Sequence, residues 1–221
     1  MHITRLELQT PDLKEQALFY GEILELDTRI IAGTEVLVHA GATELVFTQA
    51  EEGKHSPYHF AFNVPSNQFE SAKKWLAMRA DILADESGNT IIHSNSWNSD
   101  SLYFKDAAGN ILELIARYEP QTTSDKFEIL SVSEIGLATD DVMGLVNTLQ
   151  QKAGLLPYKG ESSETFTAVG DADGLFIVVK RGRIWYPNTG VPAQFLPVRT
   201  HIQAGNLKLR LSGFPYQMDL V

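Results

Sequence analysis

The chain of 221 residues contains no cysteine. That absence excludes disulfide bonds, thiolate metal sites and cysteine nucleophiles. The sequence also lacks any run of about 18 consecutive apolar residues, the length that a membrane-spanning helix needs, and its first residues have no apolar core of signal-peptide length. We therefore expect a soluble protein of the cytoplasm with no membrane partner.

Positive charge is also scarce. The sequence has 18 Lys and Arg against 28 Asp and Glu, a formal net charge of -10, and no run of Lys or Arg offsets this excess. Nucleic acids and anionic membrane surfaces repel an acidic protein at long range, so we expect neither as a partner. The hydrophobic content of 43% is ordinary for a globular protein and is enough for a well-filled core.

What the sequence does contain is an internal repeat. A strand-like phrase occurs three times in related form, as RLELQTPD from Arg5, HFAFNVPS from His59 and EIGLATDD from Glu134. Each phrase leads into a stretch with the apolar spacing of a helix, which indicates a repeated structural module. The first residue of each phrase holds the same place in its module, so Arg, His and Glu occupy equivalent positions.

The first two modules have the order strand, helix and three strands (βαβββ). For the first module we predict the strand Thr4–Gln9, a helix from Pro11 to about Leu24, and the strands Asp27–Ala32, Glu35–His39 and Glu44–Thr48. For the second we predict the strand Tyr58–Val64, a helix that buries Phe69, Ala72, Trp75 and Leu76, and then four strand segments, one more than in the first module: Ile82–Ala84, Thr90–Ser94, Ser101–Lys105 and Ile111–Ala116. We expect these two modules to pair into one domain, residues 1–118.

The third module follows a polar stretch, residues 119–126, which we interpret as a linker. Residues 127–221 are then expected to contain the strand Ser131–Ala138, a helix from Asp140, the strands Thr165–Val169 and Leu175–Lys180, and a C-terminal hairpin of Val198–Gln203 with Leu207–Leu211. The predicted fold class is α+β. A third module without a partner would leave strand edges open, so we expect the hairpin or the second chain of a homodimer to cover it.

Strand alternation separates two faces of each opening strand. One face is apolar and must pack against the helix of its module, while the other is polar or small, as in a sheet that lines a cavity. The polar face carries Arg5, His59 and Glu134. The last strand of the second module adds Glu113 to an otherwise apolar run. Because burial of an unpaired carboxylate is costly, Glu113 must be exposed, protonated, paired with a cation or bound to a metal.

Three segments, in this order, resemble the glyoxalase/bleomycin-resistance/extradiol-dioxygenase group, the vicinal oxygen chelate superfamily. They are PDLKEQALFYGEILEL at the first helix, HFAFNV at His59, and LYFKDAAGNILELI around Glu113. The resemblance implies that two βαβββ modules pair into a cupped, barrel-like sheet that holds a divalent metal, with His59 and Glu113 as ligands. The third module resembles the family more faintly, and the tail after about Gly182 has no counterpart in the minimal family fold.

The sequence departs from the family pattern at the ligand position of the first module, which is Arg5. Arginine has no lone pair to offer a metal and stays protonated, and two ligands rarely hold a catalytic metal. One hypothesis is therefore a binding or resistance-type module with a degenerate site, in which Arg5 pairs with Glu113 and forms a polar floor with His59. The alternative is a dioxygenase, lyase or isomerase with Fe, Mn, Zn or Ni at His59 and Glu113, acting on a small oxygenated substrate.

Other side chains are candidates for contact with a small-molecule ligand. Besides Arg5 they are Phe47, His93, Trp97 and Tyr103. Glu134 has no matching carboxylate in the last strand of its own module, where Val178 stands, so we interpret it as structural. Trp185 is interpreted as a plug over the third sheet.

Overall fold

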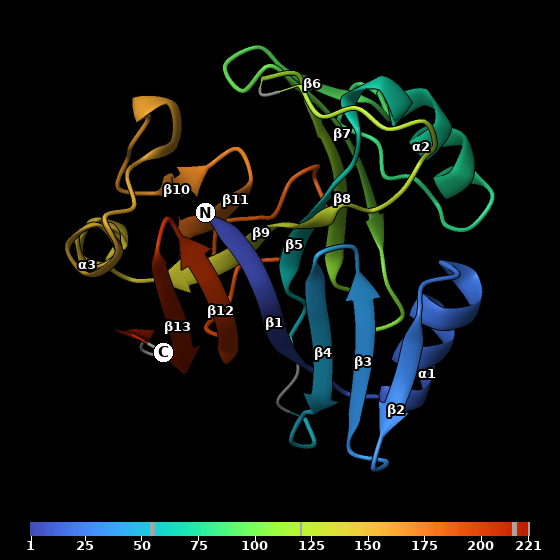
Figure 1. The fold of residues 1–221 in the computed structure, drawn as a ribbon, viewed down its shortest axis with the longest axis horizontal. Coiled ribbons are helices and arrows are strands. Elements are labelled where there is room, and N and C mark those ends of the chain that lie inside the picture. The colour runs from blue at the N-terminus through green and yellow to red at the C-terminus, as the bar shows by residue number, and fades with distance from the viewer. Residues whose placement is uncertain (54–55, 120, 214–215, 221) are drawn as a thin grey trace.

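The strands form two curled sheets of seven strands each (Figure 1). The computed structural model describes residues 1–53, 56–119, 121–213 and 216–220. Sheet A has the strand order β14-β13-β12-β1-β4-β3-β2, and sheet B has the order β10-β11-β9-β5-β8-β7-β6. The α+β class and the repeated βαβββ modules predicted from the sequence are confirmed.

The first module supplies four strands of sheet A. Its elements are β1 (His2–Thr10), α1 (Leu13–Leu18), the π-helix η1 (Phe19–Ile23), β2 (Thr28–Ile31), β3 (Glu35–Ala40) and β4 (Thr43–Gln49). The side chain of Asp12 caps α1 by accepting hydrogen bonds from the backbone N–H groups of Lys14 and Glu15. The crossover through α1 makes β1 and β4 parallel neighbours.

The second module supplies four strands of sheet B. Its elements are β5 (His59–Asn63), the 3-10 helix η2 (Ser66–Gln68), α2 (Phe69–Ala77), β6 (Ile92–Ser94), β7 (Ser99–Lys105) and β8 (Ile111–Arg117). The predicted strand Ile82–Ala84 is wrong, because Leu83 forms only an isolated bridge with Tyr103.

The third module is one strand shorter. It consists of β9 (Ser131–Thr139), α3 (Val142–Ala153), the 3-10 helix η3 (Tyr158–Gly160), β10 (Phe166–Asp171) and β11 (Gly174–Lys180). The C-terminal hairpin is confirmed as β12 (Val198–Ala204) and β13 (Leu207–Gly213), and β14 (Gln217–Leu220) extends it. The predicted linker, residues 119–126, falls in the loop between β8 and β9, and its Pro120 lies outside the described residues.

The modules pair with different partners than predicted. β5 pairs with β9, so sheet B joins the second and third modules, whereas β1 pairs with β12, so sheet A joins the first module to the C-terminal hairpin. The side chains of β9 and β1 explain why each strand has its partner. β9 is buried on both faces and so fits the interior of sheet B. One face of β1 stays polar, and its Glu7 forms an ion pair of 2.9 Å with Arg199 of β12. The first two modules, residues 1–118, therefore do not join their strands into one sheet, and β10 of the third module forms one edge of sheet B.

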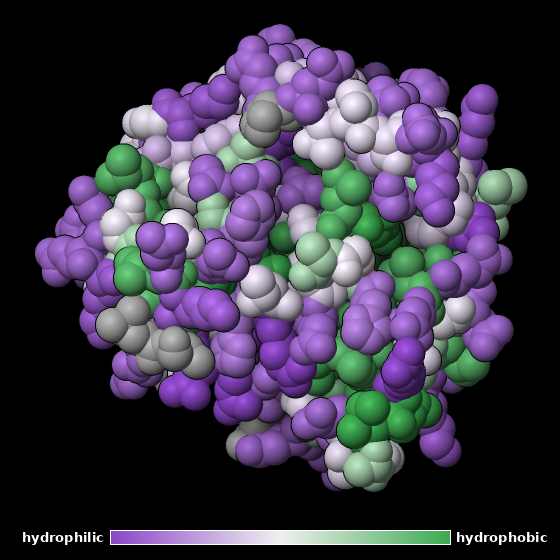
Figure 2. Space-filling model, in the orientation of Figure 1, coloured by the Kyte–Doolittle hydropathy of each residue, from purple (hydrophilic) through white to green (hydrophobic). Residues whose placement is uncertain are grey.

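One continuous apolar cluster runs through both sheets and includes Leu45 in the first module, Phe60 in the second and Ile135 in the third. The face shown in Figure 2 is mostly hydrophilic, and apolar residues gather at its lower right, over β2, where Ile30 and Ile31 are exposed. No helix among the described residues is long and apolar enough to cross a bilayer.

Candidate metal centre

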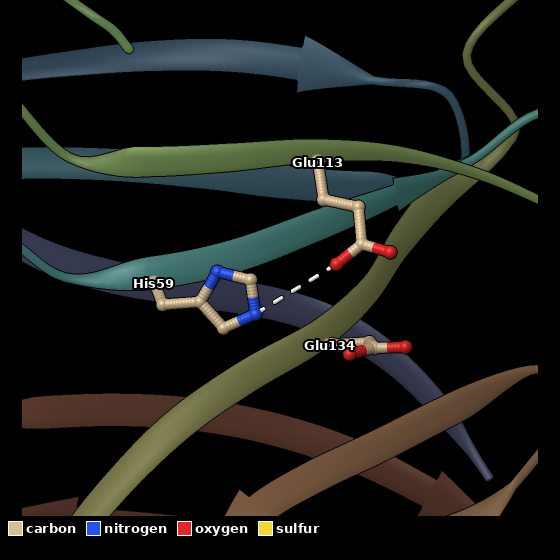
Figure 3. Close-up of side chains that lie close together, drawn as sticks. All are labelled: His59, Glu113 and Glu134. Atoms are coloured by element: carbon tan, nitrogen blue, oxygen red, sulfur yellow. Dashed lines mark ion pairs between the residues drawn. The ribbon is translucent and has the colours of Figure 1, made fainter. Parts of the chain in front are cut away.

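Three acidic or imidazole side chains converge inside sheet B (Figure 3). They are His59 of β5, Glu113 of β8 and Glu134 of β9, from three neighbouring strands. All three are buried, and one possible ligand atom of each lies within 4.8 Å of the others. Among the described residues, no other group of three His, Cys, Asp or Glu side chains is placed in this way.

The strand register brings these side chains together. Ala61 of β5 lies opposite Glu113 on β8 and opposite Glu134 on β9. Since residues that face each other across neighbouring strands project to the same side of the sheet, both carboxyls flank Ala61, two residues after His59. The small side chain of Ala61 leaves space between them.

His59 is held in the form that binds metals. Its Nδ1 lies 3.1 Å from the carbonyl oxygen of Ile111 and must donate to it, because a carbonyl only accepts. The Nε2 lone pair then points toward the carboxyl of Glu113, with 3.8 Å between Nε2 and Oε2. Burial lowers the pKa of His59, against the charge of Glu134, and favours the neutral imidazole.

The two carboxyls hold their protons more tightly than exposed ones do. Burial raises the pKa of Glu113, against hydrogen bonds from Ser101 and Tyr103 that lower it. Burial and the nearby charge of Glu113 together raise the pKa of Glu134 to about 7. Two acidic groups in one buried site are expected to resist simultaneous ionisation unless a cation joins them.

Arg117, at the end of β8, supplies one cation. It is buried and donates a hydrogen bond from Nη2 to Glu134. Its Nη1 donates to Asn63 Oδ1 at 2.9 Å and to Ser133 Oγ at 2.6 Å. The guanidinium thus holds one oxygen of Glu134 in place, and the other carboxyl oxygen stays available to a ligand near His59.

A cavity of about 280 Å³ adjoins the three side chains. Trp185 forms one wall, and its ring lies tilted by 37° against that of His59 with 4.9 Å between the ring centroids. Gly136 of β9 permits this approach, because a Cβ there would lie 2.6 Å from the indole. The wall is mostly aromatic and aliphatic, with Trp97, Tyr103, Ile115, Phe166, Ile177 and Tyr186 among its members.

Solved structures show the same architecture. A putative dioxygenase from Bacillus subtilis subsp. subtilis str. 168 superposes with a TM-score of 0.62 at 12% identity, covering 96% of this chain and 81% of that one. A glyoxalase I mutant from Zea mays gives 0.56 at 11% identity, covering 96% and 88%. This chain has the glyoxalase/dioxygenase fold. No family model and no curated protein matches its sequence.

Within the glyoxalase/dioxygenase fold, the predicted ligand contacts divide into two groups. Trp97 and Tyr103 line the cavity of sheet B. Phe47 lies instead in the apolar core, fully buried, with its ring centroid 5.1 Å from that of Tyr20. His93 is exposed and pairs with Asp100 at 2.8 Å. Trp185, expected as a plug, is buried against β9 and is also part of the cavity wall.

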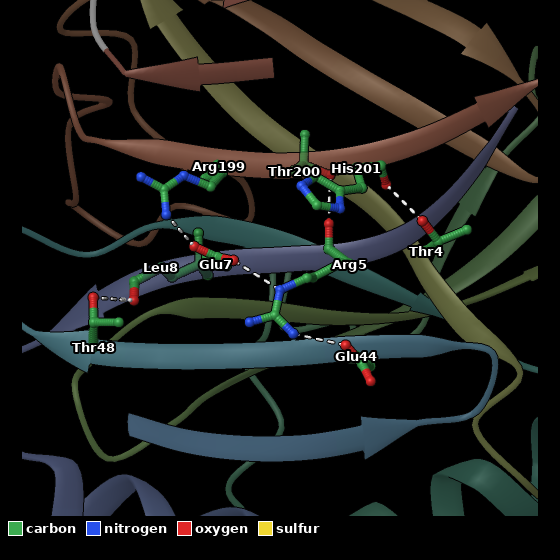
Figure 4. A network of polar contacts seen from close by, with 9 residues as sticks. All are labelled: Thr4, Arg5, Glu7, Leu8, Glu44, Thr48, Arg199, Thr200 and His201. Carbon is green, nitrogen blue, oxygen red and sulfur yellow. Dashed lines mark hydrogen bonds and ion pairs between the residues drawn. The ribbon is translucent and has the colours of Figure 1, made fainter. Parts of the chain in front are cut away.

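Arg5 lies in the other sheet. Its Nε and Nη1 bind Glu7 and Glu44, each at 2.7 Å, within the polar network of sheet A (Figure 4). The predicted contact between Arg5 and Glu113 is therefore wrong, because β1 pairs with β12 and not with β5. The guanidinium of Arg5 is already satisfied by two carboxylates of its own module.

Two residues of the candidate centre were missed from the sequence. Glu134 opens the third repeated phrase, so its equivalence to His59 was a signal for the site; its role depends on the pairing of β5 with β9. Arg117 ends the strand that carries Glu113, and no pattern in the sequence distinguishes it from an exposed arginine. Both become part of one centre only through the sheet order.

Proposed function

We propose that this protein is a metal-dependent enzyme that holds a divalent cation, Fe, Mn, Zn or Ni, at His59, Glu113 and Glu134. The observation that carries the proposal is the convergence of these three buried donors from three strands. We infer that its substrate is a small oxygenated molecule that enters the adjoining cavity, and that the reaction is that of a dioxygenase, lyase or isomerase.

The donor set fits such a cation. One imidazole and two carboxylates suit divalent transition metals, and three protein ligands leave coordination positions for water and substrate. Small rotations of the side chains would bring donors within 4.8 Å of each other to coordination distance. The hydrogen bond from His59 to Ile111 orients the imidazole as backbone carbonyls do behind many metal ligands.

When bound, such a metal would supply Lewis acidity that polarises an oxygen of the substrate. The chain's own residues do the rest. Trp185 covers one side of His59, and His59 itself is only 7% exposed, which limits its contact with bulk water. Hydrogen bonds from Tyr103 and Ser101 orient the carboxyl of Glu113 and oppose the rise of its pKa on burial.

A binding or resistance-type module without metal is the second candidate. Arg117 supports it, because its guanidinium already gives Glu134 a cationic partner. In that case the cavity of sheet B would recognise a small molecule and leave it unchanged.

Metal analysis of protein purified without chelators or a His tag tests the proposal. We expect about one equivalent of metal in the natural protein and its loss in His59→Ala and Glu134→Gln. The matched control is His93→Ala, which removes an exposed histidine outside the cavity and should keep the metal. Protein that stays free of metal after incubation with excess cation would leave the binding module as the better proposal.

The site we propose is complete within one chain, since all its donors and walls come from sheet B and the segment after β11. Homodimerisation stays a prediction that light scattering at micromolar concentration would check, and a monomer would not weaken the proposed activity.

A further inference from the structure

Three buried polar atoms in the neighbourhood of Trp97, which lines the cavity, have no protein hydrogen-bond partner among the described residues. They are Ser99 Oγ, Arg117 Nε and Tyr158 Oη. Their residues are only 1%, 5% and 7% exposed. Buried polar groups are nearly always paired, so three such atoms in one region call for an explanation. Only two other side-chain atoms in the described parts of the chain share this property, and both lie elsewhere.

Tyr158 and Arg117 contact the ring of Trp97, and Ser99 follows Trp97 by two residues in the chain. Ser99 lies directly opposite Arg117 on the neighbouring strand, so the two side chains share one face of sheet B. The rings of Trp97 and Tyr158 meet edge to face with 5.3 Å between their centroids. The Arg117 guanidinium carbon lies 5.8 Å from the Trp97 ring and 6.0 Å from the Tyr158 ring. Ser99 and Trp97 line the cavity itself.

The unpartnered atoms share one kind of chemistry. An arginine Nε only donates hydrogen bonds, and serine and tyrosine hydroxyls can both donate. Three donors beside a guanidinium match a group with several acceptor oxygens and a negative charge, such as a carboxylate. The other nitrogens of Arg117 are already bound to Asn63, Ser133 and Glu134, which fixes the guanidinium in place.

Charge balance leads to the same conclusion. With a divalent cation present, the ionised Glu113 and Glu134 cancel the metal charge, and Arg117 leaves one positive charge in a buried site. A site with one uncompensated buried charge is unfavourable, and a ligand with one negative charge would balance it.

We propose that the Trp97 end of the cavity is a recognition subsite for an oxyanion, so that the substrate is a small acid with its carboxylate at this end and its reacting oxygens near His59. This inference rests on the proposed metal-dependent function. On β7 and β8, Tyr103 lies opposite Glu113 at the metal end and Ser99 lies opposite Arg117 at the Trp97 end. These two pairs are four residues apart, which is about 13 Å along the strands. Side chains reach into that span, which leaves room for a single ring or a short chain between the two ends.

Three probes test the subsite in the zinc-loaded protein. Benzohydroxamate binds metals through two oxygens, and its 4-carboxy and 4-carbamoyl derivatives add a charged or a neutral group of the same shape. We expect calorimetry to show that the carboxy probe binds about tenfold more tightly than the carbamoyl probe. Ser99→Ala and Tyr158→Phe should each reduce that preference about threefold or more, with zinc binding and benzohydroxamate affinity unchanged.

The matched control is Ser66→Ala, which removes a buried hydroxyl that donates to the carbonyl of Thr122 and is not part of the cavity lining, and which should keep the full preference. Equal affinity for the two derivatives in the natural protein would overturn the proposal, as would a preference that survives in both Ser99→Ala and Tyr158→Phe. If the protein takes up no zinc, the metal function fails separately. In that case, the affinities of benzoate and benzamide for the natural protein, measured by quenching of tryptophan fluorescence, test the subsite. Tighter binding of benzoate that is lost in Ser99→Ala supports the subsite, and equal affinities overturn it.

Discussion

At the scale of single residues, Glu113 and Glu134 are two acidic side chains buried in one cavity. The folded protein ionises them at greater cost than the unfolded chain does, because burial raises the pKa of both. For Glu134 the pKa rises from 4.5 to about 7. The destabilisation is therefore absent below pH 4.5, grows as the pH rises, and is complete above about 7 in protein without metal.

The variant Glu113→Gln should relieve this cost. It removes one buried charge and the repulsion on Glu134, so we expect the metal-free variant to be about 1–3 kcal/mol more stable than the natural protein near pH 8. The gain should shrink as the pH falls toward 4.5, because the raised pKa values let both carboxyls take up protons as the pH falls. Urea unfolding in the presence of a chelator, at several pH values, measures the difference between the two proteins.

Glu44→Gln is the control for this prediction. Glu44 is a half-exposed carboxylate paired with Arg5 on sheet A, so its loss should change stability by less than about 1 kcal/mol at any pH. The same Glu113→Gln protein should lose metal binding, because a neutral amide is a weak ligand. A variant less stable than the natural protein near pH 8 would contradict the assigned burial cost.

These residues also show how far the sequence predicts the site. His59 and Glu113 are predictable, because each is a polar residue in an apolar strand and the family resemblance implies a ligand at each position. The sequence favours a structural role for Glu134, because the last strand of its own module offers no second carboxylate. The missing information was the order of strands, which places Glu134 beside His59 and leaves Arg5 in the other sheet.

At the scale of elements, β8 and β11 are equivalent last strands of the second and third modules. Ala61 follows His59 by two residues in β5, and Gly136 follows Glu134 by two residues in β9, so these two small residues are equivalent. Ala61 lies opposite Glu113 on β8, and Gly136 lies opposite Ile177 on β11. Ile177 is therefore the structural counterpart of Glu113, and it lines the cavity. Val178, the counterpart predicted from the sequence, points the other way into the core.

Ile177→Glu should add a fourth donor to the proposed centre. We expect metal affinity to rise about tenfold or more, because the new carboxylate starts from the strand position that Glu113 occupies in the second module. Without metal the variant should be about 2–5 kcal/mol less stable, since it buries a third acid. Calorimetric metal titration and thermal unfolding with and without metal measure both effects.

Sheet A provides a matched control. Val46 is the counterpart of Glu113 there, but Arg5 and Arg199 stand at the places of His59 and Glu134. Val46→Glu should therefore gain no metal binding, because arginines offer no lone pair. Tighter metal binding by Val46→Glu, or none gained by Ile177→Glu, would show that strand position does not determine the donor set.

The element boundaries were largely predictable, because alternation and helical spacing are local signals. β8, β9 and β11 each begin at or within one residue of the predicted position. The pairing of modules was not predictable in the same way. A repeat shows which strands are equivalent, whereas the choice of neighbour depends on contacts between distant faces, such as Glu7 with Arg199.

At the scale of the whole molecule, the two sheets are joined by buried hydrogen bonds as well as by apolar packing. Thr43 Oγ1 donates to the carbonyl of Ile3 in sheet A at 2.6 Å and accepts from the backbone N–H of Val132 in sheet B at 2.9 Å. Asp106, in the turn between β7 and β8, accepts from Gln16 of α1 and Tyr20 of η1. We therefore expect the two halves to unfold as one cooperative unit.

Leu45→Ala tests this coupling from a distance. Leu45 is fully buried in β4 of sheet A, so truncating it should cost about 2–5 kcal/mol. Two of the three tryptophans, Trp97 and Trp185, line the cavity of sheet B, so their fluorescence reports on the other half of the molecule. If both halves unfold together, the fluorescence transition in urea must shift by the same amount as the circular dichroism transition of all strands, even though the mutated residue is in sheet A. Leu18→Ala, at a half-exposed leucine of α1, should shift neither transition appreciably. A fluorescence midpoint that stays in place while the dichroism curve divides into two steps would mean that sheet B is stable without sheet A, and the candidate metal centre would then depend on the second and third modules alone.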